Sequence, residues 1–205
     1  MENFAVVDCE TTGLHPGIDQ IVSIGAVDFA TGEEFYEECR IYKWNRVTET
    51  ALKINGFTEE QCRDPKKQTP LQAYYKFRKW CVDRKIKLLA GHNIADFDVK
   101  FLKLLEYKGK FNKWPFKYCY IDLHSIAFDR FKESLSHKKI CLKLGIEPEP
   151  NPHNALEGAK SEWRCLRELL KYDLPFVPEF IFNEPEIPET FGNGVFISNY
   201  QDIKI

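Results

Sequence analysis

Two acidic residues near the start of the chain, Asp8 and Glu10, have the type and spacing to bind a divalent cation. They follow the apolar run 4–7, which is typical of a buried strand. In an extended chain, residues i and i+2 point to the same face, about 7 Å apart along the backbone. Neighbouring carboxylates repel unless a cation lies between them, and Mg²⁺ prefers such oxygen ligands. The alternative is a solvated Asp and Glu beside a surface turn.

Two further segments carry residues suited to the same chemistry. Asp98 is predicted to lie in the first turn of a helix that follows a strand, where the helix dipole stabilises a carboxylate. An ordinary helix-start acid is the alternative. His153 directly precedes another predicted helix, and its unperturbed pKa of about 6.5 suits a general base at neutral pH. A structural or solvated histidine is the alternative there.

Taken together, in this order, the three segments resemble the motifs of the DEDDh 3′–5′ exonucleases, proofreading-type nucleases with a ribonuclease-H-like fold. Residues 7–14 (VDCETTGL) resemble the first motif, residues 92–102 the second and residues 153–156 the third. Intermediate segments are also similar, namely 21–27, 51–58 and 120–123. The likeness covers about residues 3–172.

This resemblance implies phosphodiester hydrolysis with two divalent ions, Mg²⁺ or Mn²⁺. It implies that Asp8, Glu10 and Asp98 hold the metal and that His153 takes the proton of the attacking water. The residues implied to bind the terminal nucleotide are Thr11, Thr12, Gly13, Leu14, His92, Asn93 and Phe97. For Phe97, a place in the core is the alternative. The implied substrate is a single-stranded or frayed DNA 3′ end, with RNA as the alternative.

The chain departs from the family pattern at one position. The family has an aspartate five residues after the motif histidine, and this chain has Gly158 there. Glycine offers no ligand, and the neighbouring Glu157 points about 100° away on a helix. The chain is an impaired natural member, a deliberate variant or the product of a single base change, and the sequence leaves these three open. We expect lowered activity, with a non-catalytic binding module as the alternative function.

The elements that must position these residues are predicted from periodicity and turn signals. Strands are expected at 4–7, 20–29, 33–42, 86–90 and 118–121, the first three as an antiparallel meander. Helices are expected at 48–54, from 70 onward, and at 95–107, 123–131, 135–144 and 154–172. The fold class is therefore α/β, a ribonuclease-H-like mixed five-stranded sheet flanked by helices.

Composition limits the binding partners and the cellular location that we expect for the protein. The net charge of −2 gives no overall attraction to nucleic acid, so contacts must come from local basic clusters or from metal ions. Seven cysteines at irregular spacing do not form a disulfide framework. The chain lacks a signal-like start and a membrane-spanning run, so we expect a cytoplasmic protein with no membrane partner.

Two domains of unequal character are predicted. Residues 1–173 form the exonuclease-like domain, and residues 174–205 form a proline-containing extended tail, since its four prolines exclude a continuous helix. An extended segment of this kind is a candidate docking site for a protein partner.

Overall fold

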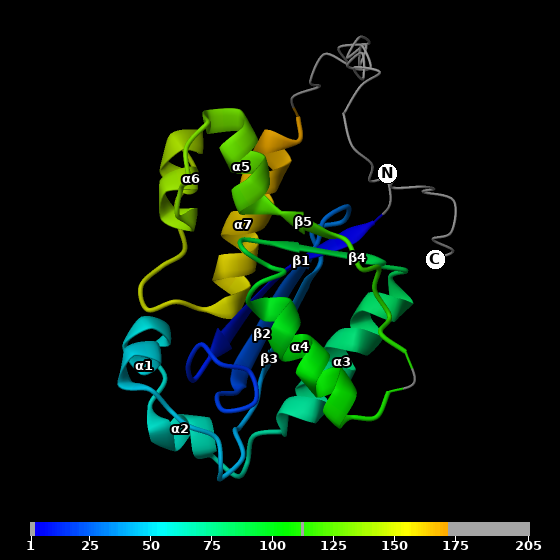
Figure 1. Cartoon of the computed structure of the whole chain (residues 1–205), viewed down its shortest axis with the longest axis vertical. Helices are drawn as coiled ribbons and strands as arrows, with labels where there is room; N and C mark the ends of the chain where they lie inside the picture. Colours follow the sequence, from blue (N-terminus) through cyan, green and yellow to red (C-terminus); the bar gives the residue numbers. More distant parts are fainter. Residues whose placement is uncertain (1–2, 112, 172–205) are drawn as a thin grey trace, which may run out of the picture. The chain divides into compact units, whose positions relative to one another are not determined.

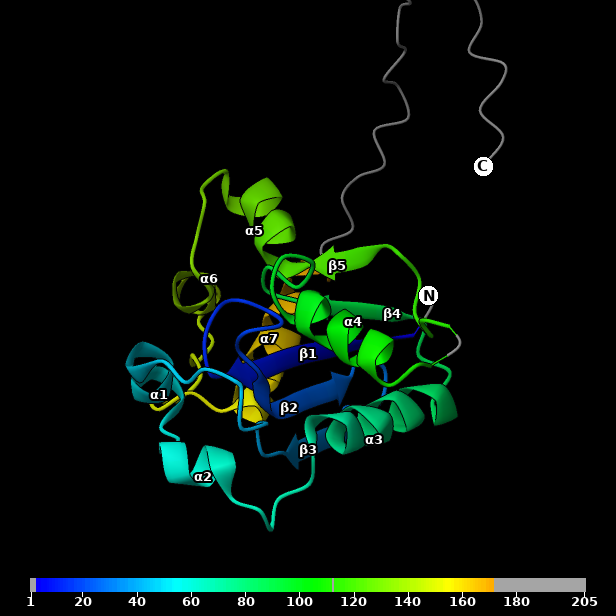
Figure 2. The same ribbon diagram turned by 60° about the horizontal axis from the view of Figure 1, so that its bottom comes forward.

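The computed structural model of the chain describes residues 3–111 and 113–171. Five strands form one mixed sheet, with the order β3-β2-β1-β4-β5. Their bounds are β1 Phe4–Thr11, β2 Ile21–Asp28, β3 Glu34–Glu38, β4 Leu88–Gly91 and β5 Tyr120–Asp122. Strands β1, β2 and β3 are antiparallel neighbours, whereas β4 runs parallel to both β1 and β5. The central strand β1 thus joins the antiparallel and parallel halves (Figure 2).

Helices cover both faces of this sheet (Figure 1). On one face lie α3 (Pro70–Asp83) and α4 (Asp98–Lys108). On the other face lie α5 (Leu123–Phe131), α6 (His137–Leu144) and the longer α7 (Ala155–Leu169), which packs on β1 and β2. Two short helices, α1 (Glu49–Asn55) and α2 (Glu59–Arg63), lie beyond one end of the sheet, where β1 finishes.

The alternation of side chains along β1 builds the two apolar layers. Ala5 and Val7 belong to the layer under α3 and α4, whereas Phe4 and Val6 belong to the layer under α5, α6 and α7. Asp8 and Glu10 continue the second set, because residues two apart in a strand share a face. The sequence of β1 therefore directs both carboxylates toward the side covered by α7.

Gly25 allows α7 to approach the sheet closely. It pairs with Asp8 across β1 and β2, and a Cβ atom at this position would collide with the backbone of Ala155 and Leu156. Only glycine fits such an approach of backbone to backbone. The first turn of α7 consequently lies directly over the strand position that carries Asp8.

Most predicted elements are confirmed, with corrections at their ends. The meander is present, but its third strand covers only Glu34–Glu38 instead of residues 33–42. The helix predicted from residue 95 begins at Asp98. Helix α2 escaped prediction because it spans only five residues, too few to show a helical period. The helix predicted over 154–172 ends at Leu169, which is buried, and the next residue, Leu170, is exposed.

Helix ends follow the signals in the sequence. Thr48 caps α1 by accepting a hydrogen bond from the Ala51 N–H, and Gly56 ends that helix in the left-handed region. Thr69 and Gln72 form a capping box at the start of α3, whose first residue is Pro70. No helix among residues 3–111 and 113–171 is long and apolar enough to cross a membrane. The predicted tail, 174–205, lies outside the described residues.

Candidate active site

Strand β1 brings Asp8 and Glu10 to the end of the sheet, beyond the last paired residues of β4. Burial and the charge of Glu149 raise the pKa of Asp8 to about 7. Burial and the charges of Asp8, Glu149 and Asp98 raise the pKa of Glu10 to about 9. In the described part of the chain, neither carboxylate forms an ion pair with a lysine or arginine. The two acids therefore lie together without a lysine or arginine partner among the described residues, and the charge of His137 offsets only part of the rise in the pKa of Asp8.

Asp98 approaches Asp8 and Glu10 from the start of α4, as predicted. It is the first residue of α4 and is only 3% exposed, and its Oδ1 atom has no hydrogen-bond partner. Burial and the charge of Asp8 raise the pKa of Asp98 well above its usual value. A buried carboxylate oxygen with no partner is costly, and a bound cation would remove that cost.

His153 lies at the entrance to α7. Its N–H donates to the Ile54 carbonyl oxygen at 2.8 Å, which ties the segment to α1. The next residue, Asn154, caps α7 by accepting hydrogen bonds from the N–H groups of Leu156 and Glu157. His153 is thus held just outside the helix, and its Nδ1 atom lies 3.1 Å from Oε1 of Glu149.

Gly158 lies beside Asp8, at the position where the motif pattern expects a carboxylate. A Cβ atom at position 158 would collide with the Asp8 carboxylate and would lie 3.1 Å from Oε2 of Glu149. Glu157 does not replace the missing acid, because its carboxylate pairs with Lys160 at 3.2 Å. The absence of a side chain at 158 therefore lets the carboxylates of Asp8 and Glu149 occupy this space.

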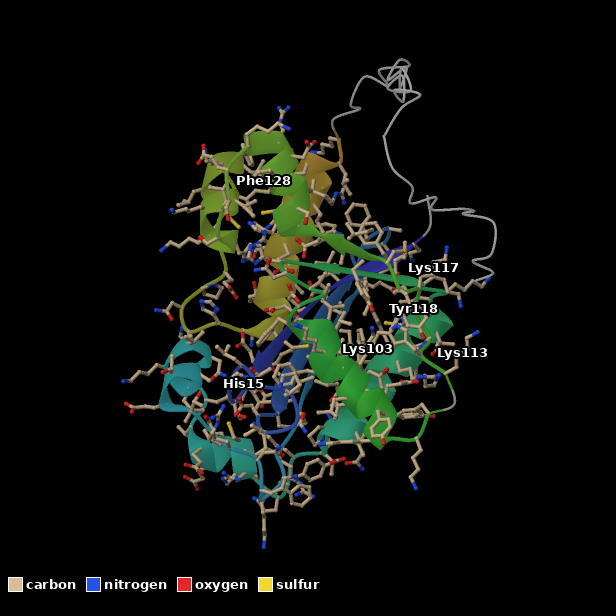
Figure 3. The ribbon with its side chains drawn as sticks, viewed as in Figure 1. His15, Lys103, Lys113, Lys117, Tyr118 and Phe128 are labelled. Atoms are coloured by element: carbon tan, nitrogen blue, oxygen red, sulfur yellow. The ribbon has the colours of Figure 1, made fainter. Side chains whose placement is uncertain are left out.

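A cavity of about 480 Å³ opens beside these residues. The predicted site residues that line it are Asp8, Glu10, Thr11, Gly13, Leu14, Phe97 and His153. Leu14 is 73% exposed at its mouth, on the loop after β1 that also carries His15 (Figure 3). Both carboxylates and apolar side chains line the cavity, a combination that suits a nucleotide with its phosphate and base.

Three residues predicted to bind substrate do not line this cavity. Thr12 is fully buried, and its hydroxyl accepts a hydrogen bond from the Gln20 N–H. His92 lies near the Leu135 carbonyl oxygen and beside the rings of His124 and His137. Asn93 is exposed in a turn with a positive φ of 55°. Their predicted role in binding substrate stays a prediction.

Helix α1 fixes the loop that follows β1. The Asn55 side-chain amide donates to the Thr11 carbonyl oxygen at 3.0 Å, and the Thr48 hydroxyl donates to the Thr12 carbonyl oxygen at 3.0 Å. The Thr11 hydroxyl donates to the Gly13 carbonyl oxygen at 2.7 Å. Because three hydrogen bonds hold it, this loop presents Gly13 and Leu14 to the cavity in one conformation.

Two acidic residues at the site were not predicted. Glu149 lies on the loop between α6 and α7 and lines the cavity. Glu162 lies one turn after Gly158 on α7, is buried, and has an Oε2 atom with no hydrogen-bond partner. Spacing on a helix could have identified Glu162, since residues i and i+4 share a face. Nothing in the sequence around Glu149 distinguishes it from a surface loop acid.

This donor set suits a hard divalent cation. Carboxylates supply nearly all its ligand atoms, and those of Asp98, Glu149 and Glu162 each include a buried oxygen that has no partner. The ligand atoms of Glu10, Glu149 and His153 lie within 4.8 Å of one another. Mg²⁺ and Mn²⁺ favour oxygen ligands of this kind. The residues present therefore fit such an ion.

Comparisons with known proteins agree with this geometry. The RNase_T family model, described as "Exonuclease", matches residues 5–161. The PolC-type DNA polymerase III of Thermotoga maritima is 32% identical over 159 residues, which are 77% of this chain and 11% of that protein. The PolC-type enzyme of Bacillus subtilis is 27% identical over 173 residues, 83% of this chain and 12% of that protein. The chain spans little more than a tenth of the length of these curated relatives.

Solved structures share the fold. The nuclease domain of 3′hExo, a DEDDh family member bound to rAMP, has a TM-score of 0.67 at 18% identity and covers 83% of this chain and 92% of that chain. Escherichia coli exonuclease I in complex with an oligonucleotide has a TM-score of 0.70 at 18% identity and covers 85% of this chain and 42% of that chain. The mixed five-stranded sheet flanked by helices, expected from the sequence, is thus confirmed as the exonuclease fold.

Proposed function

The chain belongs to the RNase_T exonuclease family, and on that basis we propose that it removes nucleotides one at a time from the 3′ ends of single-stranded or frayed DNA. The observation that carries this proposal is that Asp8 and Glu10 line one cavity with His153, while the buried Asp98 lies close enough for its charge to help raise the pKa of Glu10. RNA is the alternative substrate, because one structural neighbour is a 3′-exonuclease that recognises the 3′ end of a histone mRNA stem-loop.

The residues divide the task between them. Asp8, Glu10 and Asp98 would hold two divalent ions, Mg²⁺ or Mn²⁺, which offset the charge that builds on the phosphoryl oxygens. His153, which lines the same cavity as Asp8 and Glu10, would accept the proton of the attacking water. Leu14 and Phe97, apolar side chains of the same lining, would pack against the terminal base.

Gly158 lowers the rate in this proposal, because an aspartate there would add a carboxylate directly beside Asp8. The same residue favours a second candidate, a module that grips a 3′ end without cleaving it. The two differ in their need for metal, since a nuclease turns over only with divalent ions whereas a binding module retains single strands in a chelator.

The experiment follows a 5′-labelled single-stranded DNA, and a matched RNA, with Mg²⁺, with Mn²⁺ and with a chelator. We expect shortening from the 3′ end that stops in the chelator and falls by about 10³-fold in Asp98→Ala. Asp96→Ala is the control, because Asp96 is exposed and pairs with Lys100. Binding without trimming under every condition would favour the module.

Two expectations from the sequence complete the proposal. A protein partner would dock on residues 174–205, and deletion after Leu174 tests this by its effect on partner binding. A cytoplasmic location is our second expectation, and fractionation of cells that express the protein measures it.

A further inference from the structure

Glu149 occupies the part of the site that Gly158 leaves empty. Its Oε2 atom lies 3.1 Å from the point where a Cβ atom at position 158 would be, and this oxygen has no hydrogen-bond partner. An aspartate at 158 would start from that same point and project its carboxylate into the same region. The loop acid and the missing helix acid thus compete for one place.

Both ends of the Glu149 carboxylate face functional groups. Oε1 lies 3.1 Å from Nδ1 of His153 and 3.7 Å from Nδ1 of His137. Its ligand atom lies within 4.8 Å of those of Glu10 and His153. The Glu149 side chain is 13% exposed, so it is largely removed from solvent while it lies among other carboxylates.

A carboxylate in this environment needs a cation on the side away from the histidines. Glu162, which is 4% exposed, has an Oε2 atom with no hydrogen-bond partner, and the charges of Asp8 and Glu149 both act on it, which is a second sign that a ligand is missing there. The Glu149 charge already contributes to the raised pKa of both Asp8 and Glu10. A divalent ion would relieve all of these repulsions at once.

We propose that Glu149 replaces the acid absent from position 158, with Oε2 as a ligand of the divalent cation and Oε1 holding Nδ1 of His153. The second contact keeps Nε2 of His153 free to face the attacking water, since the hydrogen bond at one ring nitrogen fixes the other. Glu149 is therefore both a metal ligand and a positioning residue for the base. This inference depends on the proposed exonuclease function.

The test compares Glu149→Gln with Glu147→Gln, an exposed acid on the same loop. Mn²⁺ binding is measured by calorimetry on the full chain, and trimming of a single-stranded DNA is measured across pH. We expect Glu149→Gln to bind Mn²⁺ at least about 10-fold more weakly and to shift the pH profile set by His153, and Glu147→Gln to match the parent. Equal Mn²⁺ affinity in the two variants would overturn the inference.

A carboxylate swap sharpens this test. Gly158→Asp should raise Mn²⁺ affinity and trimming more in the Glu149→Gln background than in the parent, because in the parent the two acids compete for one place. Identical effects in both backgrounds would contradict the replacement. If the parent itself neither binds Mn²⁺ nor trims DNA, the proposed function fails; if only the variants disagree, the role of Glu149 alone fails.

A second cluster, between α6 and α7, is built from different donor atoms. His137 and Cys141 lie one turn apart on α6, and Ser161 and Cys165 lie one turn apart on α7. The Cys141 and Cys165 sulfur atoms are 3.4 Å apart, and Nε2 of His137 lies 3.3 Å from Cys141 Sγ and 3.0 Å from Ser161 Oγ. Two i,i+4 pairs on facing helices thus converge on one point.

The spacing of these atoms is close to that of a tetrahedral metal site. With Zn–S of about 2.3 Å and Zn–N of about 2.0–2.1 Å, neighbouring ligand atoms lie roughly 3.5–3.8 Å apart. The ligand atoms of His137, Cys141 and Cys165 all lie within 4.8 Å of one another.

From this geometry, independent of the carboxylate site, we infer a zinc site formed by His137, Cys141 and Cys165, with Ser161 or a water beside the fourth position. Nδ1 of His137 faces Glu149, the carboxylate–histidine arrangement that commonly supports a metal-bound imidazole. The site would hold α6 against α7 and so fix the loop that carries Glu149.

Cobalt(II) distinguishes this site from the carboxylates. The full chain is stripped of metal, loaded with one equivalent of Co²⁺ and examined for the near-ultraviolet sulfur-to-cobalt band, which oxygen ligands do not give. We expect this band in the parent and in Cys81→Ala, a buried cysteine outside the cluster, and its loss in Cys165→Ala. No sulfur band in the folded parent would overturn the inference, whatever the variants do.

Discussion

The two sides of the carboxylate site are built in different ways. On the strand side, β1 and the start of α4 supply Asp8, Glu10 and Asp98 from regular elements whose geometry follows from local sequence. On the helix side, α7 has Gly158 where an acid is expected and Glu162 one turn later, and Glu149 reaches the site from a loop. A regular element fixes where a side chain points, whereas a loop residue reaches a site only through tertiary contacts.

The comparison predicts that loss of a strand-side acid costs most. Asp8→Ala removes the carboxylate beside Gly158, whose charge also acts on Glu10, so trimming of single-stranded DNA should fall by about 10³-fold. Its thermal stability without metal should hold or rise, since a repelled buried acid is removed. Asp129→Ala, an exposed acid on α5, is the control. If Asp8→Ala lost less trimming activity than Glu149→Gln, the helix side would matter more than the strand side.

An added methyl group on the helix side should have an intermediate effect. Gly158→Ala supplies no ligand but displaces the Asp8 carboxylate, with which its Cβ would collide. We expect Mn²⁺ affinity to fall about 10-fold and the free energy of unfolding to fall by about 1–3 kcal/mol. Glu157→Ala, the neighbour that points to Lys160, should leave Mn²⁺ affinity unchanged. If calorimetry showed the same Mn²⁺ affinity in Gly158→Ala as in the parent, the Asp8 carboxylate could move freely.

The apolar lining of the cavity should contribute less to DNA trimming than the acids of the strand side or the helix side. Leu14 is 73% exposed, so Leu14→Ala should leave stability unchanged while KM for single-stranded DNA rises by about 3- to 10-fold. Leu142→Ala, 61% exposed on α6, is the matched control. Steady-state kinetics with both variants measure the difference, and an equal KM would remove Leu14 from the pocket.

The pH dependence of stability reports on the burial of Asp8 and Glu10 and on the charges around them. Both acids bind protons more tightly in the folded chain, with pKa values raised from 3.8 to about 7 and from 4.5 to about 9, first by burial and then by neighbouring carboxylates. Without metal, their contribution to stability should therefore be fully present below pH 3.8 and decline as pH rises toward 9, by at most about 1.4 kcal/mol per pH unit for each group. Mn²⁺ should oppose this decline, and melting curves across pH measure both effects. A flat profile would show that folding does not raise the pKa values of these acids.

Basic and aromatic residues show a further contrast between pattern and structure. The sequence places Tyr107, Trp114 and Phe116 among lysines, as base-stacking residues often are. Trp114 and Phe116 are buried in the core, and Tyr107 is exposed. The Lys103 ammonium group lies over the rings of Trp114, Tyr118 and Tyr120, so this cation packs against aromatic side chains of the protein (Figure 3).

Alternation and capping are local properties of the chain, so the strands and most helix ends could be predicted from the residues alone. The acids Asp8, Glu10 and Asp98, and the gap in the pattern at Gly158, were found through the resemblance to the exonuclease motifs. What fills that gap is a matter of tertiary structure. Glu149 has no local signal, and it reaches Asp8 because the loop before α7 is held by His153 on Ile54, while Gly25 lets α7 lie directly on the sheet. Contacts between distant segments depend on packing, which no local pattern encodes.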